Sequence, residues 1–197
     1  ADLMPTDLSN AQIAVLGLHA AERAHVRAPT ETWSRIEGAW LAAIVRGGGW
    51  GYLQRTDIEP TGGMTAGGIA ALAMVREVLE DRSPKRDAAV RAGFRILDRL
   101  GPMGEWRTDP DDRWRRGHIT SQYFFYWLYS LERAGALWDR AKIGGQDWFA
   151  AGSKYLLATQ RPDGGWGPAD DHKGKLMCYT PDAERAACTA FAVLFLA

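Results

Sequence analysis

Four segments of the chain are apolar nearly all round, and they recur at a regular interval. Residues 14–18, 70–74, 127–131 and 192–196 superpose at offsets of 56, 57 and 65 residues (70 − 14, 127 − 70 and 192 − 127). A helix that is apolar on every side must be buried on most sides. The pattern therefore predicts four inner helices, near residues 8–22, 64–79, 119–134 and 182–196.

Three amphipathic segments lie between these apolar ones. Their apolar residues follow the helical period, as in the series Trp33, Ile36, Trp40 and Ile44, and charged residues occupy the opposite face. This pattern is typical of helices with one face in the core and one in water. We expect outer helices near residues 30–45, 84–100 and 146–160, and almost no β-strand.

A glycine-tryptophan turn follows each predicted outer helix. The turns lie at residues 47–51, 101–106 and 160–167, and their tryptophans, Trp50, Trp106 and Trp166, are 56 and 60 residues apart (106 − 50 and 166 − 106). A repeat of this length is the mark of stacked supersecondary units. The sequence therefore predicts one all-α domain over residues 1–197, built of about 3.5 helical hairpins whose turn tryptophans are buried.

Composition narrows the possible functions. Lys plus Arg and Asp plus Glu number 24 each, so the net charge is zero, and the basic footprint of a nucleic-acid binder is missing. Two cysteines, Cys178 and Cys188, exclude a disulfide framework. No run of residues is long and apolar enough for a membrane span, and no signal-peptide pattern stands out. The cell compartment stays open. Because the pattern stops inside an apolar helix, we expect a piece of a longer protein.

The stretch Gln-Arg-Pro-Asp-Gly-Gly-Trp-Gly at 160–167 resembles the repeat signature of the prenyltransferase and squalene-cyclase superfamily. The inner helix after each turn is similar to that family as well, and the likeness extends over the chain three times. The resemblance implies an (α/α) toroid, complete or partial, in which inner helices ring a central cavity. It is strongest to bacterial proteins known only for these repeats, and the fold hosts several unrelated functions.

The resemblance also implies two possible chemistries. Class II terpene cyclases, which are isomerases or lyases, protonate their substrate with an Asp-X-Asp-Asp motif, and here residues 109–112 read Asp-Pro-Asp-Asp. Asp111 and Asp112, with His118 nearby, are the catalytic candidates. The alternative is a solvated loop, because Arg113 and Arg115 follow directly and would favour ionised carboxylates.

Protein prenyltransferases of this superfamily hold zinc with Asp, Cys and His side chains. The comparable residues here are His118, His172, Cys178, Asp182 and Cys188. No closely spaced ligand pair occurs among them, whereas a zinc site needs three or four converging ligands. We predict no metal and no cofactor.

One expectation does not depend on the family. If the hairpins repeat, the inner helices are parallel and their N-termini form a polar end of the cavity. Ser121 and Arg185 would lie at that end, above an aromatic wall. The wall residues are Tyr123, Tyr126, Trp127 and Phe191. The alternative is that these residues only cap and pack the helices.

These features favour a repeat domain that binds a hydrophobic small molecule, a peptide segment or a partner chain in its concave face. The cyclase-like enzyme that uses Asp111 or Asp112 is the alternative. An open ring would leave apolar ends for self-association or for the remainder of the same protein. A lyase acting on acidic polysaccharide is disfavoured because the chain carries no net positive charge.

Overall fold

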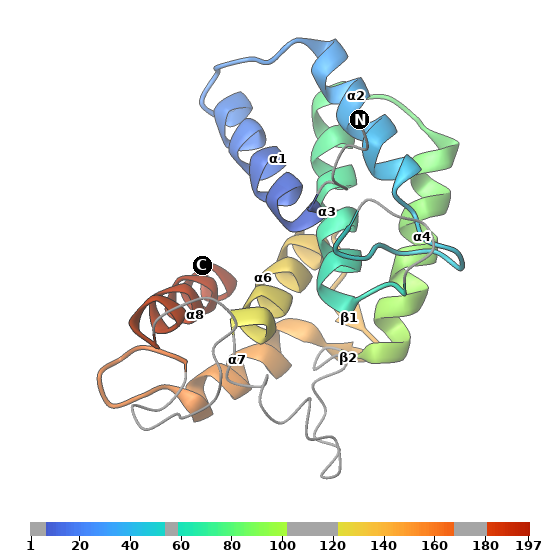
Figure 1. Cartoon of the computed structure of the whole chain (residues 1–197). Helices are drawn as coiled ribbons and strands as arrows, with labels where there is room; N and C mark the ends of the chain where they lie inside the picture. Colours follow the sequence, from blue (N-terminus) through green and yellow to red (C-terminus); the bar gives the residue numbers. More distant parts are fainter. Residues whose placement is uncertain (1–6, 54–58, 102–121, 168–180) are drawn as a thin grey trace.

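A computed structural model of the chain describes residues 7–53, 59–101, 122–167 and 181–197 (Figure 1). Within them the predicted all-α class is confirmed, because seven helices and one short hairpin make up the regular structure. The helices are α1 (Leu8–Arg23), α2 (Thr30–Ala42), α3 (Gly62–Leu79), α4 (Pro84–Leu100), α6 (Gln122–Leu137), α7 (Trp148–Thr159) and α8 (Pro181–Leu196). The strands are β1 (Lys142–Ile143) and β2 (Gln146–Asp147).

Side-chain caps explain where several helices begin. The Asp7 carboxylate accepts hydrogen bonds from the amides of Ser9 and Asn10 and so caps α1. The hydroxyl oxygen of Thr61 caps α3 in the same way. Ser83 caps α4, whose first residue is a proline. Each cap satisfies an amide that has no partner inside the helix, and Pro is favoured at the first position because it has no such amide.

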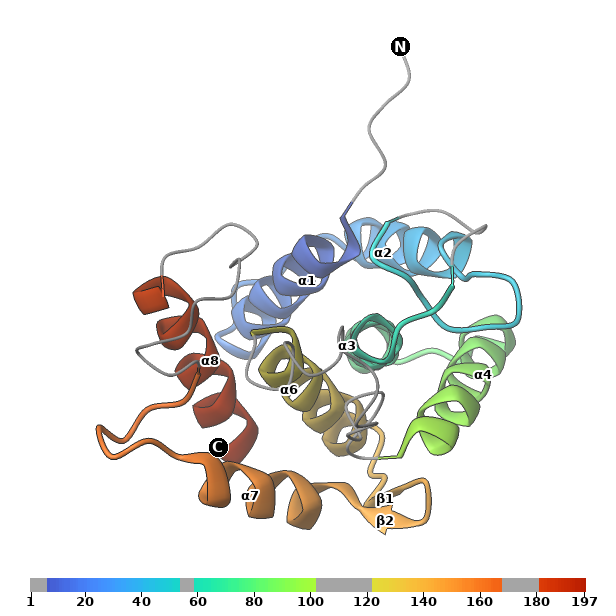
Figure 2. The same ribbon diagram turned by 60° about the horizontal axis from the view of Figure 1, so that its bottom comes forward.

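The helices form two layers. Helix α3 packs against α1, α2, α4 and α6, and α6 packs against α3, α7 and α8. We call the succession α1–α3–α6–α8 the inner row. Helices α2, α4 and α7 lie outside it (Figure 2). The row is bent, and both views place its two end helices, α1 and α8, on the same side of the molecule (Figures 1 and 2).

Contacts near the helix ends give the direction of the inner row. His19 Nε2 lies 3.1 Å from Glu77 Oε2, which joins the last turns of α1 and α3. Arg76, also in the last turn of α3, donates from Nη2 to the carbonyl oxygen of Leu137 at 3.2 Å, at the end of α6. Helices α1, α3 and α6 are therefore parallel. Outer helix α4 runs the opposite way along α3, because Leu100 at its end lies against Gly62 at the start of α3.

Helix α3 is the centre of the core. All but one of its residues from Gly62 to Val75 are buried. Two glycines allow its neighbours to approach closely. A Cβ on Gly68 would lie 2.4 Å from the indole of Trp50, and one on Gly67 would lie 2.4 Å from the Gln12 amide. Larger residues at these two positions would push the Trp50 turn and α1 away from the core.

The first and third glycine-tryptophan turns share the same hydrogen bonds. The amide of Gly48 donates to the carbonyl of Val45, and the amide of Val45 donates to the carbonyl of Gly49. The third turn has the same two bonds 116 positions later (161 − 45). The amide of Gly164 donates to the carbonyl of Arg161, and the amide of Arg161 donates to the carbonyl of Gly165. Gly48 and Gly164 have positive φ, at 97° and 86°. Such a conformation is easily adopted only by glycine, which explains the glycine-rich sequence of both turns.

The tryptophan of each turn clamps two layers together. Trp50 Nε1 donates to the carbonyl of Trp40 at 2.8 Å, and Trp166 Nε1 donates to the carbonyl of Leu156 at 2.9 Å, in each case ten residues back in the outer helix. Both indoles are buried, at 0% and 5% exposure. The sequence prediction of buried turn tryptophans is thus confirmed for these two. Trp106 lies outside the described residues.

A threonine of the next inner helix completes each clamp. The backbone amide of Trp50 donates to Thr65 Oγ1 at 3.3 Å, and that of Trp166 donates to Thr189 Oγ1 at 3.0 Å. One tryptophan therefore joins the outer helix, the turn and the following inner helix in each of these two hairpins.

A buried ion pair joins two outer helices. Arg86 of α4 is fully buried, and its guanidinium lies 3.1 Å from Glu37 of α2 and 2.7 Å from Asp81. Removing one member of a buried pair leaves an uncompensated charge, so this contact fixes α4 against α2.

The structure differs from the sequence prediction between α6 and α7. The sequence placed the end of this inner helix near residue 134, but α6 continues through Gly135 to Leu137. A Cβ at Gly135 would lie 2.6 Å from the Trp148 indole, so this glycine makes room for a ring and does not end the helix. Strands β1 and β2 then pair in an antiparallel hairpin, where Gly144 and Gly145 adopt positive φ. Two such residues suit a tight hairpin turn.

No helix in the described part of the chain has the length and apolar character needed to cross a membrane.

We predict that Trp166→Ala lowers the free energy of unfolding by about 3–5 kcal/mol, because it removes a packed indole and leaves a cavity. Chemical denaturation monitored by circular dichroism measures the change. Leu157→Ala is the matched control, because this side chain is exposed and its removal should have little effect. A loss below about 1 kcal/mol for Trp166→Ala would contradict the role of the turn as a clamp.

Candidate functional site

An aromatic cluster joins α6 to α8 on the inner row. The ring of Phe191 lies 5.6 Å from that of Tyr126 and 5.6 Å from that of Tyr129, measured between centroids. The two tyrosines are 7% exposed, and Phe191 is half-buried. We call Tyr126, Tyr129 and Phe191 the inner aromatic cluster. The structure thus brings together two of the residues that the sequence placed in one wall, Tyr126 and Phe191.

A buried polar network lies beside this cluster. The Tyr126 hydroxyl donates to Gln12 Oε1, and the Gln12 amide nitrogen lies 3.4 Å from Ser130 Oγ. Gln12 and Ser130 are fully buried. Burial raises the pKa of Tyr126 far above its usual value, so the phenol stays neutral and acts as a hydrogen-bond donor. The network ties α1 directly to α6.

Gln12 was missed by the sequence analysis, although a signal was present. Leu8, Gln12, Val15 and His19 are the buried residues of α1, and they follow one another at helical spacing on a single face. A polar residue within such a buried face needs a hydrogen-bond partner. Tyr126 is that partner.

An ion pair completes the polar groups near the cluster. Arg133 donates from Nε and Nη2 to the two carboxylate oxygens of Glu132, which is buried. Both groups interact electrostatically with Tyr129, whose pKa is raised mainly by burial. Because the charges of Glu132 and Arg133 compensate each other, little net charge lies beside the cluster.

Trp127 occupies a different place from its neighbour Tyr126. It is 1% exposed, and a Cβ on Gly62 would lie 2.8 Å from its ring, so Trp127 packs in the core between α6 and α3. Little of this ring remains to contact a ligand.

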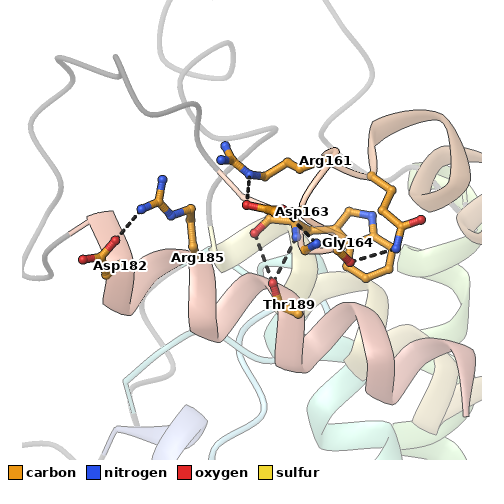
Figure 3. Close-up of polar contacts among 9 residues, drawn as sticks. Arg161, Asp163, Gly164, Asp182, Arg185 and Thr189 are labelled. Atoms are coloured by element: carbon orange, nitrogen blue, oxygen red, sulfur yellow. Dashed lines mark hydrogen bonds and ion pairs between the residues drawn. The ribbon is translucent and has the colours of Figure 1, made fainter.

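Arg185 lies beside the third glycine-tryptophan turn (Figure 3). Its guanidinium donates to the carboxylate of Asp182 in the first turn of α8. A Cβ on Gly167 would lie 3.1 Å from the Arg185 Cα, so turn and helix are in close contact here. Within the turn itself, Asp163 accepts from the amide of Gly165 and from Arg161, and these two hydrogen bonds lower its pKa. Arg185 therefore borders the turn on α8.

The remaining candidates fall outside what the structure describes. Asp111, Asp112, His118 and Ser121 belong to residues 102–121, and only the backbone of Tyr123 is described, within α6. His172 and Cys178 lie in residues 168–180. Among the described residues, no group of three or more His, Cys, Asp or Glu side chains could hold a metal ion. Burial raises the pKa of Cys188 to about 12, which keeps it a neutral thiol near pH 7.

Comparison with known proteins adds no relative, because no family model, curated protein or solved structure matches the chain.

We predict that Tyr126→Phe lowers the free energy of unfolding by about 1–3 kcal/mol, since it leaves the buried Gln12 oxygen without its donor. Urea denaturation measures the loss. The Gln12→Leu variant provides the second arm of a double-mutant cycle. Additive effects of the two substitutions would show that the hydroxyl and the amide are not coupled.

We also predict that the purified protein carries no stoichiometric zinc. Elemental analysis after dialysis checks this, with Cys178→Ala and His172→Ala as the variants that would lose a bound metal. One equivalent of zinc that disappears in either variant would contradict the prediction and support the prenyltransferase comparison.

Proposed function

We propose that this chain is a repeat domain of the prenyltransferase and squalene-cyclase type. It would form a partial (α/α) toroid that binds an apolar or peptide-like ligand, or a partner chain, on its concave inner face. The observation that carries the proposal is the inner aromatic cluster of Tyr126, Tyr129 and Phe191. It lies where two successive inner helices meet.

The arrangement of layers supports the toroid. Inner and outer helices alternate along the chain, each inner helix packs on the previous inner one, and α1, α3 and α6 are parallel. The same tryptophan clamp recurs 116 residues apart (166 − 50). Repeated units joined by the same local contact are rotated by similar amounts, which bends the row. The bend visible in Figure 2 is in line with this.

The chemistry of the cluster favours an apolar ligand with few polar groups. Phe191 is the most exposed ring of the cluster, and Tyr126 and Tyr129, each 7% exposed, pack behind it. The polar groups beside them already have partners, namely Tyr126 with Gln12 and Glu132 with Arg133. A highly charged ligand would find no uncompensated charge to pair with at this point. A lipid-like molecule or an apolar peptide side chain would gain from burial against the rings.

The cyclase-like alternative depends on Asp111 and Asp112. Both residues lie outside the described residues, so no observation favours that function over binding.

We predict that Phe191→Ala weakens binding of an apolar fluorescent probe, anilinonaphthalene sulfonate, by about tenfold, which corresponds to about 1.4 kcal/mol. Fluorescence titration gives the dissociation constant, and competition with a fifteen-carbon isoprenoid alcohol tests whether a lipid-like molecule takes the same site. Val26→Ala is the control, because Val26 is exposed between α1 and α2, away from the cluster. Equal dissociation constants for Phe191→Ala and the unmodified chain would contradict the proposal.

A further inference from the structure

Helix α8 has two apolar faces, of which one is buried and one is exposed. Cys188, Ala192 and Phe195 are buried against the rest of the domain. On the other side, Val193, Leu194 and Leu196 are 53%, 44% and 38% exposed. Large apolar side chains gathered on one exposed surface usually mark an interaction site.

The threonines of the tryptophan clamps align α8 with α3. Thr65 and Thr189 accept the same hydrogen bond from the turn before their helix, and they are 124 residues apart (189 − 65). A residue of α8 therefore corresponds to the α3 residue 124 positions earlier. The alignment by apolar runs had given 122 (192 − 70), so the structure corrects that register by two residues.

In α3, the corresponding face is covered by the next hairpin, α4 and α6. Gly62 lies against Trp127 of α6 and Leu100 of α4, and Ile69 lies against Gly93 of α4. Ala66 and Ala70 follow Gly62 at four-residue intervals on the same face and are fully buried. Helix α3 is thus buried against both helices of the hairpin that follows it.

The equivalent residues of α8 are exposed. The register places Ala186, Ala190 and Leu194 at the positions of Gly62, Ala66 and Ala70, and Val193 at the position of Ile69. All four are solvent-exposed. By contrast, Phe191 corresponds to Gly67, and both residues face the preceding inner helix, α6 and α1 respectively. The register therefore distinguishes the side of α8 that packs on α6 from the side that is exposed to solvent.

The outer layer shows the same difference. Leu157 of α7 corresponds to Leu41 of α2 at the 116-residue spacing of the turns (157 − 41). Leu41 is partly buried against the core, and its helix contacts α4. Leu157 is 72% exposed. Both helices of the last described hairpin thus expose apolar residues at positions that are covered in an earlier one.

We propose that the exposed face of α8 and α7 is the docking surface for a further helical hairpin of this repeat type. Its outer helix would precede its inner helix, and the two would pack on α8 as α4 and α6 pack on α3. The inference rests on the repeat interpretation in the proposed function. It follows from continuity, because the free face is the same interface that joins α3 to the next hairpin. Ala186 and Ala190 are small and so permit a close approach, although the ring equivalent to Trp127 would have to shift slightly, because a Cβ at the position of Gly62 lies 2.8 Å from that ring.

A second copy of the chain does not supply this hairpin. Within the described residues, the inner helices α3 and α6 are each covered by helices on both sides. Helix α1 has an exposed apolar residue, Ile13, but no outer helix precedes it in the described part of the chain. A second copy could therefore offer one helix to α8 but no hairpin of the required order.

The register also defines the test. Ala197 corresponds to Ala73 (197 − 124), so residues 74–137, which end α3 and carry α4 and α6, are appended directly after Ala197 of the full chain. The probe is a cysteine at Leu194 in a Cys178→Ser background. Cys188 is buried and has a raised pKa, so it should not react at neutral pH. The rate of maleimide modification at residue 194 is measured in the chain with the added hairpin and in the chain without it.

We expect the added hairpin to slow modification of Leu194→Cys at least about tenfold, because local opening must then precede reaction. A helical gain in circular dichroism should accompany it. The matched control is Val26→Cys, which should react equally fast in both chains. Adding Ala190→Glu to the extended chain should restore the fast reaction at residue 194, since a charge would be buried in the contact.

Equal reactivity of Leu194→Cys with and without the hairpin would overturn the inference. So would a concentration-dependent dimer of the unextended chain in which residue 194 is protected, because a second copy would then be the occupant. Binding of the fluorescent probe at Phe191 is measured in the same proteins. Loss of docking with intact probe binding removes this inference alone, whereas loss of probe binding alone removes the proposed ligand site.

Discussion

The hydrogen bond from a turn tryptophan to a carbonyl ten residues earlier is the contact on which the described architecture depends. It holds the glycine-rich turn against the end of the outer helix, while the amide of the same tryptophan is held by a threonine of the next inner helix. Three segments are fixed by one side chain. The layers can then be close-packed because Gly68 leaves room for the Trp50 ring. Without this contact, the apolar faces of the helices would define a collapsed core but no particular register.

Most of the helical boundaries could be read from the sequence. The predicted segments 84–100 and 182–196 differ from α4 and α8 by at most one residue, because both follow the helical spacing and α4 also has a cap residue, Ser83. The predicted segment 119–134 ends three residues before α6 ends (137 − 134). Gly135 lay outside the predicted helix, whereas in the structure it belongs to α6 and makes room for the ring of Trp148, which comes from a later part of the chain. A tertiary contact of this kind leaves no local signal. The β1–β2 hairpin did leave a local signal in the sequence, because two consecutive glycines, Gly144 and Gly145, favour a tight turn.

The candidate site was only partly predictable for a geometric reason. Successive residues of a helix point about 100° apart, so Tyr126 and Trp127 cannot both face the same side. Tyr126 contacts Phe191, while Trp127 packs beneath Gly62. The predicted wall of consecutive aromatic residues therefore combined side chains from two different faces of α6. Gln12 would have been found by asking which polar residue shares the buried face of its own helix. Asp111, Asp112 and His118 lie outside the described residues.

The parallel direction of the inner helices has an electrostatic consequence. Aligned helix dipoles add, so the starts of α1, α3 and α6 together form a partly positive end and their last turns a partly negative one. Arg76 lies at the negative end, where it donates to the last carbonyl of α6 and stacks 3.8 Å from the centroid of Trp138. Arg23 occupies the last turn of α1. Because outer helix α4 runs the opposite way, its dipole offsets part of this field, which therefore acts mainly at the first and last turns of the inner helices. A negatively charged group would therefore be favoured only where it lies close to the first turns of α1, α3 and α6.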